Sequence, residues 1–155
     1  MNDKTNTKDT FRHSLKVQIR FSDLDALDHV NNGFIAQYYD LGRINYFSAA
    51  FGRRLDWTQV VVVIVHLETD FLAPIHQNDN IYVETKLTKF GKKSMHTIQR
   101  LVDKTTGEVK STCIAILSGF DRSTNKSMEI SEDFKQVFYR YEQGLPPIDT
   151  TNITE

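Results

Sequence analysis

The chain has 155 residues, of which 39% are hydrophobic and 25% are charged, and these values are ordinary for a single soluble globular domain. Its 19 basic and 20 acidic residues leave a formal charge of −1, which provides no general field for nucleic acid or for an anionic membrane. The single cysteine, Cys113, excludes an internal disulfide and a metal site built from cysteines.

The two ends of the chain are polar. Residues 1–12 have no apolar segment of the kind found in signal peptides, and no apolar run elsewhere approaches membrane-spanning length. We therefore expect a cytoplasmic protein with no membrane or nucleic-acid partner. Residues 1–12 are expected to be disordered, and residues 144–155, with two adjacent prolines, to form a flexible tail. Residues 13–143 are expected to form the folded domain.

The first predicted elements are a strand and a long helix. Leu15–Phe21 alternates apolar and polar residues, which predicts a half-buried strand. Gly33–Phe51 carries apolar side chains at steps of three and four, which predicts a helix, with Asn31 or Asn32 as its N-cap and Gly52 as its stop. The helix contains aromatic residues and few charges, so we expect the rest of the protein to cover most of it.

Four strand-like segments follow the helix. The first, Val60–Phe71, opens with six apolar residues, which favours a strand buried on both faces. The next three are separated by short turns and comprise Asn80–Phe90, Ser94–Asp103 and Glu108–Phe120. Ser131–Gln143 then predicts a short amphipathic helix. A strand, a long helix, four strands in a meander and a terminal helix together predict an α+β domain, with the long helix against a mainly antiparallel sheet.

The segment DLDALDHVNN, Asp23–Asn32, places three carboxylates, a histidine and two asparagines directly before the long helix. Unpaired N–H groups at a helix start can hold an oxyanion. If a substrate carbonyl points at the amides of Asn31, Asn32 or Gly33, a nearby carboxylate can attack the carbon or activate water. This arrangement favours acyl transfer to water without a metal or redox cofactor. Aspartate and asparagine are also common capping residues, so a structural role stays open.

The sequence RFSDLDALDHVNN, followed by a helix, resembles the start of the 4-hydroxybenzoyl-CoA thioesterase family, whose members have the hotdog fold. The resemblance extends over about Leu15–Asp133 and includes the later motif FLAPI at Phe71–Ile75. It implies a long central helix wrapped by a mainly antiparallel sheet of five to six strands. It also implies an acyl-CoA thioester hydrolase that forms a homodimer with a continuous sheet, or a homotetramer, with active sites at the subunit interface.

The resemblance also implies roles for single residues of the motif. Asp25 is nominated as nucleophile or general base, His29 as the group that orients Asp25, water or the leaving thiol, and Asn32 as an oxyanion donor supported by Asn31 and Gly33. The same run is similar to that of plant acyl-ACP thioesterases, so acyl-ACP stays open as a substrate. In those enzymes an asparagine stands at the position held here by Leu27, which weakens that form of the mechanism.

Four other charged residues near the motif are assigned weaker roles. Asp23 is expected to tie the loop to backbone amides, and Asp28 to face solvent. Asp40 and Arg43 have the spacing of an i,i+3 ion pair and are expected to be structural. Some relatives use a helix carboxylate in catalysis, so Asp40 stays a second candidate.

Coenzyme A is a long anionic ligand, and the turn around Gly91 carries Lys92, Lys93 and Ser94, which we expect to contact its phosphates as basic residues do in this region of hotdog thioesterases. Lysines at such turns are also commonly just solvated. Arg122 and Lys126 are weaker candidates for the same role. The sequence does not decide the acyl length, or between aromatic and aliphatic acyl groups.

Two other functions stay open. A hydratase on the same fold carries an aspartate with a histidine five residues later, whereas the separations from the three aspartates to His29 are six, four and one. A non-catalytic protein that binds or senses acyl-CoA is the second alternative, because a fold does not fix a function.

Overall fold

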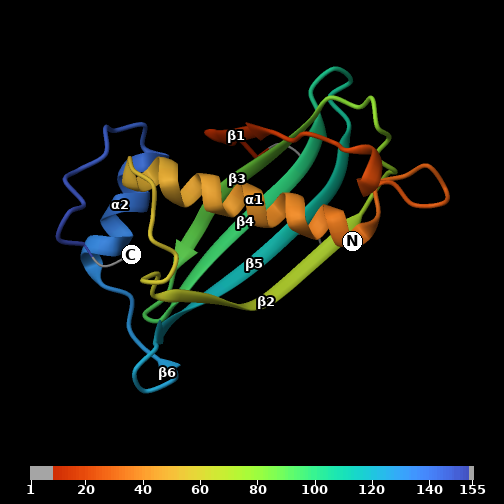
Figure 1. Ribbon diagram of the computed structural model, residues 1–155. Coiled ribbons are helices and arrows are strands. Elements are labelled where there is room, and N and C mark those ends of the chain that lie inside the picture. The colour runs from red at the N-terminus through yellow and green to blue at the C-terminus, as the bar shows by residue number, and fades with distance from the viewer. Residues whose placement is uncertain (1–8, 154–155) are drawn as a thin grey trace.

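The computed structural model describes residues 9–153 and contains one antiparallel sheet and two α-helices (Figure 1). The strands, in chain order, are β1 (His13–Lys16), β2 (Val62–Phe71), β3 (Ile81–Phe90), β4 (Ser94–Asp103), β5 (Val109–Asp121) and β6 (Lys126–Ser127). The helices are α1 (Asn32–Phe51) and α2 (Glu132–Glu142), and a 3-10 turn η1 spans Phe21–Asp23. The sheet order is β1-β3-β4-β5-β2, with β6 paired to β5. The α+β arrangement of a long helix against an antiparallel sheet is confirmed.

Helix α1 lies across one face of the curved sheet (Figure 1). Its predicted ends are confirmed, because the side chain of Asn31 accepts a hydrogen bond from the amide of Gly33, and Gly52 adopts the left-handed φ of 68° that stops the helix. Close approach to the sheet needs a glycine at position 42, since a Cβ there would lie 2.6 Å from a methyl group of Val83. The two caps therefore set the length of the helix, and Gly42 sets its distance from the sheet.

The hydrophobic core has two parts along α1. Around the C-terminal half of the helix, aromatic rings of Phe47 and Phe51 pack against Phe134 and Phe138 of α2. Around the N-terminal half, a second cluster joins α1 to β3, β4 and β5; it includes Ile35, Tyr38, Tyr39, Val83, Leu101 and Cys113. Coverage of α1 is incomplete, because Leu41 and Ile44 remain nearly half exposed on the side of β2.

Strand β2 corrects two predictions. It pairs with β5 and not with β3, so the four strands after α1 do not form a simple meander. It is also an edge strand rather than a strand buried on both faces, with Val65 60%, Leu67 49% and Phe71 51% exposed. A continuous apolar run indicates that a strand will be covered, but it does not say whether the same chain provides the cover. The predicted first strand is also shorter than expected, since β1 ends at Lys16.

The described part of the tail that was predicted to be flexible contacts the folded domain. Thr150 is buried and its hydroxyl donates to the carbonyl of Phe51 at 3.3 Å, while Ile148 and Ile153 pack against the core. The two prolines direct the chain back over the end of α1, which provides the contacts that order it. Of the predicted disordered segment 1–12, residues 1–8 lie outside the described residues, and Phe11 packs beneath the guanidinium of Arg100.

Helices in the described part of the chain are all too short or too polar to cross a membrane.

Candidate active site

The loop that precedes α1 is anchored by a buried carboxylate. Asp23 has no solvent exposure and accepts hydrogen bonds from the Tyr38 hydroxyl at 2.6 Å and from the Arg20 amide at 3.1 Å, as predicted for a residue that ties the loop to the backbone. Burial by itself would raise the pKa of Asp23, but the hydrogen bonds from Tyr38 and Arg20 outweigh burial and lower this pKa below its usual value. Burial, followed by the hydrogen bond to Asp23 and the negative charge of Asp23, raises the pKa of Tyr38 well above its usual value. The loop before α1 is therefore anchored by the ionised carboxylate of Asp23.

Asp25 lies on the exposed part of this loop. Its Oδ1 accepts hydrogen bonds from the amides of Leu27 at 2.8 Å and His29 at 3.3 Å, so the loop holds the carboxylate in one orientation. Within residues 9–153, no group donates a hydrogen bond to Oδ2 of Asp25. Asp28 completes the turn with a φ of 64° and faces solvent, as predicted. Oδ1 of Asp25 is thus used to hold the loop, while Oδ2 is available to a ligand.

The predicted catalytic residues lie together in one pocket of ≈ 390 Å³. Asp25, His29 and Asn32 line it from the loop and the helix start, and the segment Phe71–Ile75 after β2 forms the opposite wall. The two walls are joined by a hydrogen bond from the amide of Val30 to the carbonyl of Ile75. The pocket therefore combines a carboxylate, a histidine and a helix N-terminus on one side with an apolar surface on the other.

The amides at the start of α1 are mostly occupied. The amide of Asn31 donates to the Asp23 carbonyl at 2.9 Å, and the amide of Gly33 donates to the Asn31 side chain at 2.8 Å. Both amides were predicted to contribute donors to a substrate, and in this structure the N-cap already uses them. Among the described residues, none accepts a hydrogen bond from the amide of Asn32, so this amide is available to donate to a ligand.

The histidine of the motif has an unexpected neighbour. The ring of His29 makes no hydrogen bond to Asp25 but packs edge-on against the ring of His76, with centroids 5.1 Å apart. The amide of His76 donates to the Asp79 carboxylate, which also lies 3.7 Å from Lys110. His76 was not predicted as a site residue from the sequence. The one feature that could have indicated it is its position directly after the FLAPI motif and before Asp79.

The second candidate carboxylate is elsewhere. Asp40 and Arg43 form the predicted ion pair, and the buried guanidinium of Arg43 also donates to Gln99 at 2.6 Å. Asp40 comes eight residues after Asn32, about 12 Å along the helix axis. It borders a different pocket, between α1 and β2, so it does not share a site with Asp25.

The predicted phosphate contacts lie at the other end of the sheet from Asp25. The amide of Gly119 donates to the Lys93 carbonyl, and Gly119 is paired with Val62 at the start of β2. Lys92 is exposed and ion-paired with Glu129 at 3.0 Å, and Ser94 contacts His96. One chain alone therefore does not bring these residues to the Asp25 pocket.

The weaker phosphate candidates also serve other contacts or lie apart. The guanidinium of Arg122 donates to the carbonyls of Trp57 and Val60, which holds the Trp57 loop against the sheet. Lys126 lies on the short strand β6, paired to β5 beyond the sheet. In the part of the chain that is described, no three histidine, cysteine, aspartate or glutamate side chains come close enough to hold a metal ion.

Comparisons with known proteins agree with this architecture. The sequence model of the thioesterase-like superfamily matches residues 19–138 of this chain. The uncharacterized protein YsmA of Bacillus subtilis is 23% identical over 130 residues, which cover 84% of this chain and 87% of that protein. A Thermus thermophilus thioesterase, solved with coenzyme A and zinc, is 26% identical with a TM-score of 0.74, covering 83% of this chain and 98% of that one. A Synechocystis 1,4-dihydroxy-2-naphthoyl-CoA thioesterase has the same fold at 13% identity and a TM-score of 0.74, covering 84% of this chain and 97% of that one.

Proposed function

The chain belongs to the thioesterase-like superfamily and is a thioester hydrolase, and from this we propose that it cleaves acyl-CoA with Asp25 as the catalytic carboxylate. One observation carries the proposal: Asp25, whose Oδ2 accepts no hydrogen bond from the described residues, and Asn32, whose amide donates none to them, line the same pocket. A thioester carbonyl that accepts a hydrogen bond from Asn32 presents its carbon to Asp25 or to a water beside it. The coenzyme A bound by the Thermus thermophilus relative supports coenzyme A as the carrier.

The chemistry needs two steps. As a general base, Asp25 takes a proton from water while the water oxygen attacks the thioester carbon, and the carbonyl oxygen becomes an oxyanion beside the Asn32 amide. The carbonyl then re-forms, the C–S bond breaks, and the thiolate takes the proton back from Asp25 or, through His29, from solvent. If Asp25 attacks the carbon itself, the C–S bond breaks, the thiolate leaves and an anhydride forms, which water then cleaves. In a single turnover in ¹⁸O-labelled water, label in Asp25 would establish the anhydride route with water attacking the Asp25 carboxyl carbon, because the general-base route places label only in the product acid.

The activity is tested by thiol release from a panel of acyl-CoAs and acyl-ACPs. We expect acyl-CoAs to be cleaved, with acyl-ACP as the closest alternative substrate. Tight binding of acyl-CoA without thiol release would instead favour a binding or sensing protein.

We further infer that the enzyme is a homodimer joined through β2, or a tetramer of two such dimers joined by other surfaces. The free edge of β2 carries the exposed side chains of Val65, Leu67 and Phe71, and a long apolar edge strand is a template for another strand. Antiparallel pairing of two β2 strands about their middle would make one continuous sheet. It would also place the start of β2, with the Lys92–Lys93 turn behind it, beside the Asp25 pocket of the partner.

We expect the double substitution Val65→Lys and Leu67→Lys to convert the dimer to a monomer and to abolish most of the activity. The substitutions replace two exposed apolar side chains of the pairing edge by lysines close to the middle of the pairing, and lysines on an edge strand disfavour its pairing with another strand. Light scattering after size exclusion measures the mass. Ser14→Lys, on the opposite edge strand β1, is the matched control and should stay dimeric. A wild-type monomer that is fully active would contradict the inferred assembly.

Lys92→Ala together with Lys93→Ala is expected to raise KM for acyl-CoA several-fold and to change kcat little, because phosphate contacts far from the thioester bind substrate and transition state equally. Steady-state kinetics with acyl-CoA measure both constants. An acyl-pantetheine substrate, which lacks the nucleotide, is the control and should show no change in KM. An unchanged KM for acyl-CoA would remove the phosphate role of this turn.

A further inference from the structure

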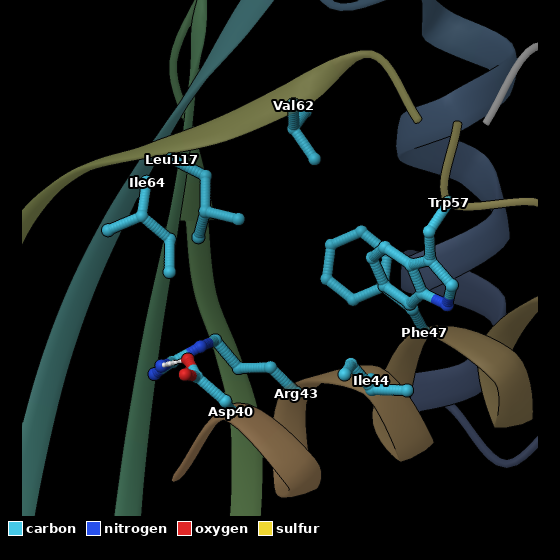
Figure 2. A pocket seen from close by; sticks show the side chains of 8 residues that line it. All are labelled: Asp40, Arg43, Ile44, Phe47, Trp57, Val62, Ile64 and Leu117. Atoms are coloured by element: carbon cyan, nitrogen blue, oxygen red, sulfur yellow. Dashed lines mark hydrogen bonds and ion pairs between the residues drawn. The ribbon is translucent and has the colours of Figure 1, made fainter. Parts of the chain in front are cut away.

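A second pocket, separate from that of Asp25, lies between α1 and β2 (Figure 2). Its apolar lining comes from α1, β2, β5 and the loop between α1 and β2, and consists of Ile44, Phe47, Trp57, Val62, Ile64 and Leu117. The rings of Phe47 and Trp57 lie at one end, tilted by 51° with centroids 5.7 Å apart, and the Asp40–Arg43 ion pair lies at the other end. The pocket thus has aromatic rings on one side, aliphatic side chains on another, and a polar edge whose two charged groups, Asp40 and Arg43, are paired with each other.

The size and polarity of this pocket define what it can hold. Its volume is ≈ 270 Å³, and an apolar protein cavity of about 150 Å³ is enough to bind benzene. A single ring or a medium-length alkyl chain therefore fits. The one carboxylate at the rim, on Asp40, already neutralises Arg43, so no cation is left to receive a charged acyl group. The pocket is suited to an uncharged apolar acyl group.

The distance from this pocket to the Asp25 pocket indicates whether it receives an acyl group from a thioester bound in the same subunit or in the partner. Within one chain, Ile44 follows Asn32 by twelve residues, about 18 Å along α1. An acyl chain would need about fourteen carbons to cover that distance, at about 1.3 Å per carbon from bonds of about 1.5 Å. Between subunits paired through β2, Val62 of one chain lies beside Phe71 of the partner, and neighbouring strands are only about 5 Å apart. Phe71 belongs to the Asp25 pocket, and Val62 to the second pocket.

The two residues also face the same side of the sheet. Val62 and Ile64 are paired with Gly119 and Leu117, and Leu117 lines the pocket beneath α1. Phe71 is paired with Ser111, whose hydroxyl accepts a hydrogen bond from Tyr39 of α1. Side chains at both ends of β2 therefore project toward the helix layer. In the inferred dimer, the Asp25 pocket of one subunit opens directly into the Trp57 pocket of the other.

We propose that the pocket between Phe47, Trp57 and Ile64 is the acyl-binding pocket, and that it receives the acyl group of a thioester cleaved by Asp25 of the partner subunit. This inference rests on the proposed function and on the β2 dimer. It makes each active site composite, with the carboxylate from one subunit and the selectivity for the acyl group from the other. Trp57 is held for this role by the bond from Arg122 to its carbonyl.

The location of the acyl group is tested first with homodimers. Ile44→Trp fills the pocket from an exposed helix position, and Trp57→Ala removes its aromatic wall. Each is expected to lower the ratio of kcat/KM for octanoyl-CoA to that for acetyl-CoA by at least about tenfold, because each methylene in an apolar pocket is worth about tenfold or more. An unchanged ratio in both variants, with Asp25→Asn inactive, would overturn the pocket assignment and leave the proposed function standing.

Mixed dimers, purified through two different affinity tags, then test which subunit provides the pocket. A dimer of one Asp25→Asn chain and one Ile44→Trp chain is expected to recover about half of the wild-type turnover of octanoyl-CoA, because one site keeps both an intact carboxylate and an open pocket. A dimer of a wild-type chain with a chain that carries both substitutions is expected to stay inactive. The reverse result, an inactive first dimer and a half-active second one, would show that pocket and carboxylate come from the same chain and would overturn the composite site. An active Asp25→Asn homodimer would instead overturn the proposed function.

Discussion

Asp25→Asn is expected to lower the turnover of acyl-CoA by at least about 100-fold without unfolding the protein, the loss typical of removing a catalytic acid or base. The amide oxygen of asparagine can still accept the bonds from Leu27 and His29 that orient this side chain. The loop therefore keeps its shape, while the group can no longer take a proton or attack a carbonyl carbon. Thiol release at saturating acyl-CoA measures the loss, and circular dichroism with thermal melting checks the fold.

The same loop provides the control. Asp28→Asn removes an equal charge three residues away, at a left-handed φ of 64° that asparagine tolerates. We expect it to retain wild-type turnover, which would separate a catalytic effect of Asp25 from a general effect of charge near the pocket. If activity survives Asp25→Ala, the assignment to Asp25 is wrong, and Asp40 becomes the next carboxylate to test.

Local sequence signals identified the helix and the polar residues of the Asp25 pocket. The N-cap Asn31 and the stop Gly52 each act within a few residues, so their effect can be seen in the sequence without knowing the fold. Asp25, His29 and Asn32 line one pocket because they are neighbours on one loop. A motif held together by a short loop is carried into the structure nearly intact.

Features that depend on the pairing of distant segments were missed. The apolar start of β2 indicates burial, but only the sheet order shows that β2 is at an edge. His76 meets His29 because the segment after β2 returns to the start of α1, a contact across 47 residues of sequence. The amide of Asn31 is occupied by the backbone carbonyl of Asp23 and that of Gly33 by the Asn31 side chain, and both bonds depend on how the loop folds back against the helix start. None of these can be derived from periodicity or spacing.

We expect Asp23→Ala to lower the free energy of unfolding at pH 7 by about 2–3 kcal/mol, because it leaves the Tyr38 hydroxyl and the Arg20 amide without their acceptor in a buried place. The exposed guanidinium of Arg20 adds little, since ion pairs that reach solvent are weak. Chemical denaturation at pH 7 measures the change. A loss below about 0.5 kcal/mol would mean that this carboxylate does not anchor the loop.

The pH dependence gives the sign of the Asp23 contribution. The pKa of Asp23 is lower in the folded protein than its usual value of 3.8, so the folded state favours the ionised form. Its stabilisation is therefore fully present above about pH 5 and is lost as the pH falls through the usual value and then the lowered folded value. In Asp23→Asn this part of the acid destabilisation should be missing, and the free energy of unfolding should fall less steeply between pH 5 and pH 3.

Tyr38→Phe separates the hydrogen bond from the charge. It removes the 2.6 Å bond to Asp23 and keeps the ring in the core, so it should bring the folded pKa of Asp23 back toward its usual value and flatten the same part of the pH profile. The double variant Asp23→Asn with Tyr38→Phe should then destabilise by less than the sum of the single variants, because both remove the same bond. Additive losses and an unchanged acid limb in Tyr38→Phe would assign the low pKa to Arg20 instead. The carbonyl of Asp23 accepts a hydrogen bond from the amide of Asn31, the residue directly before Asn32. The residue that fixes the Asp23 side chain, whether Tyr38 or Arg20, therefore also helps to fix the orientation of the Asn32 amide.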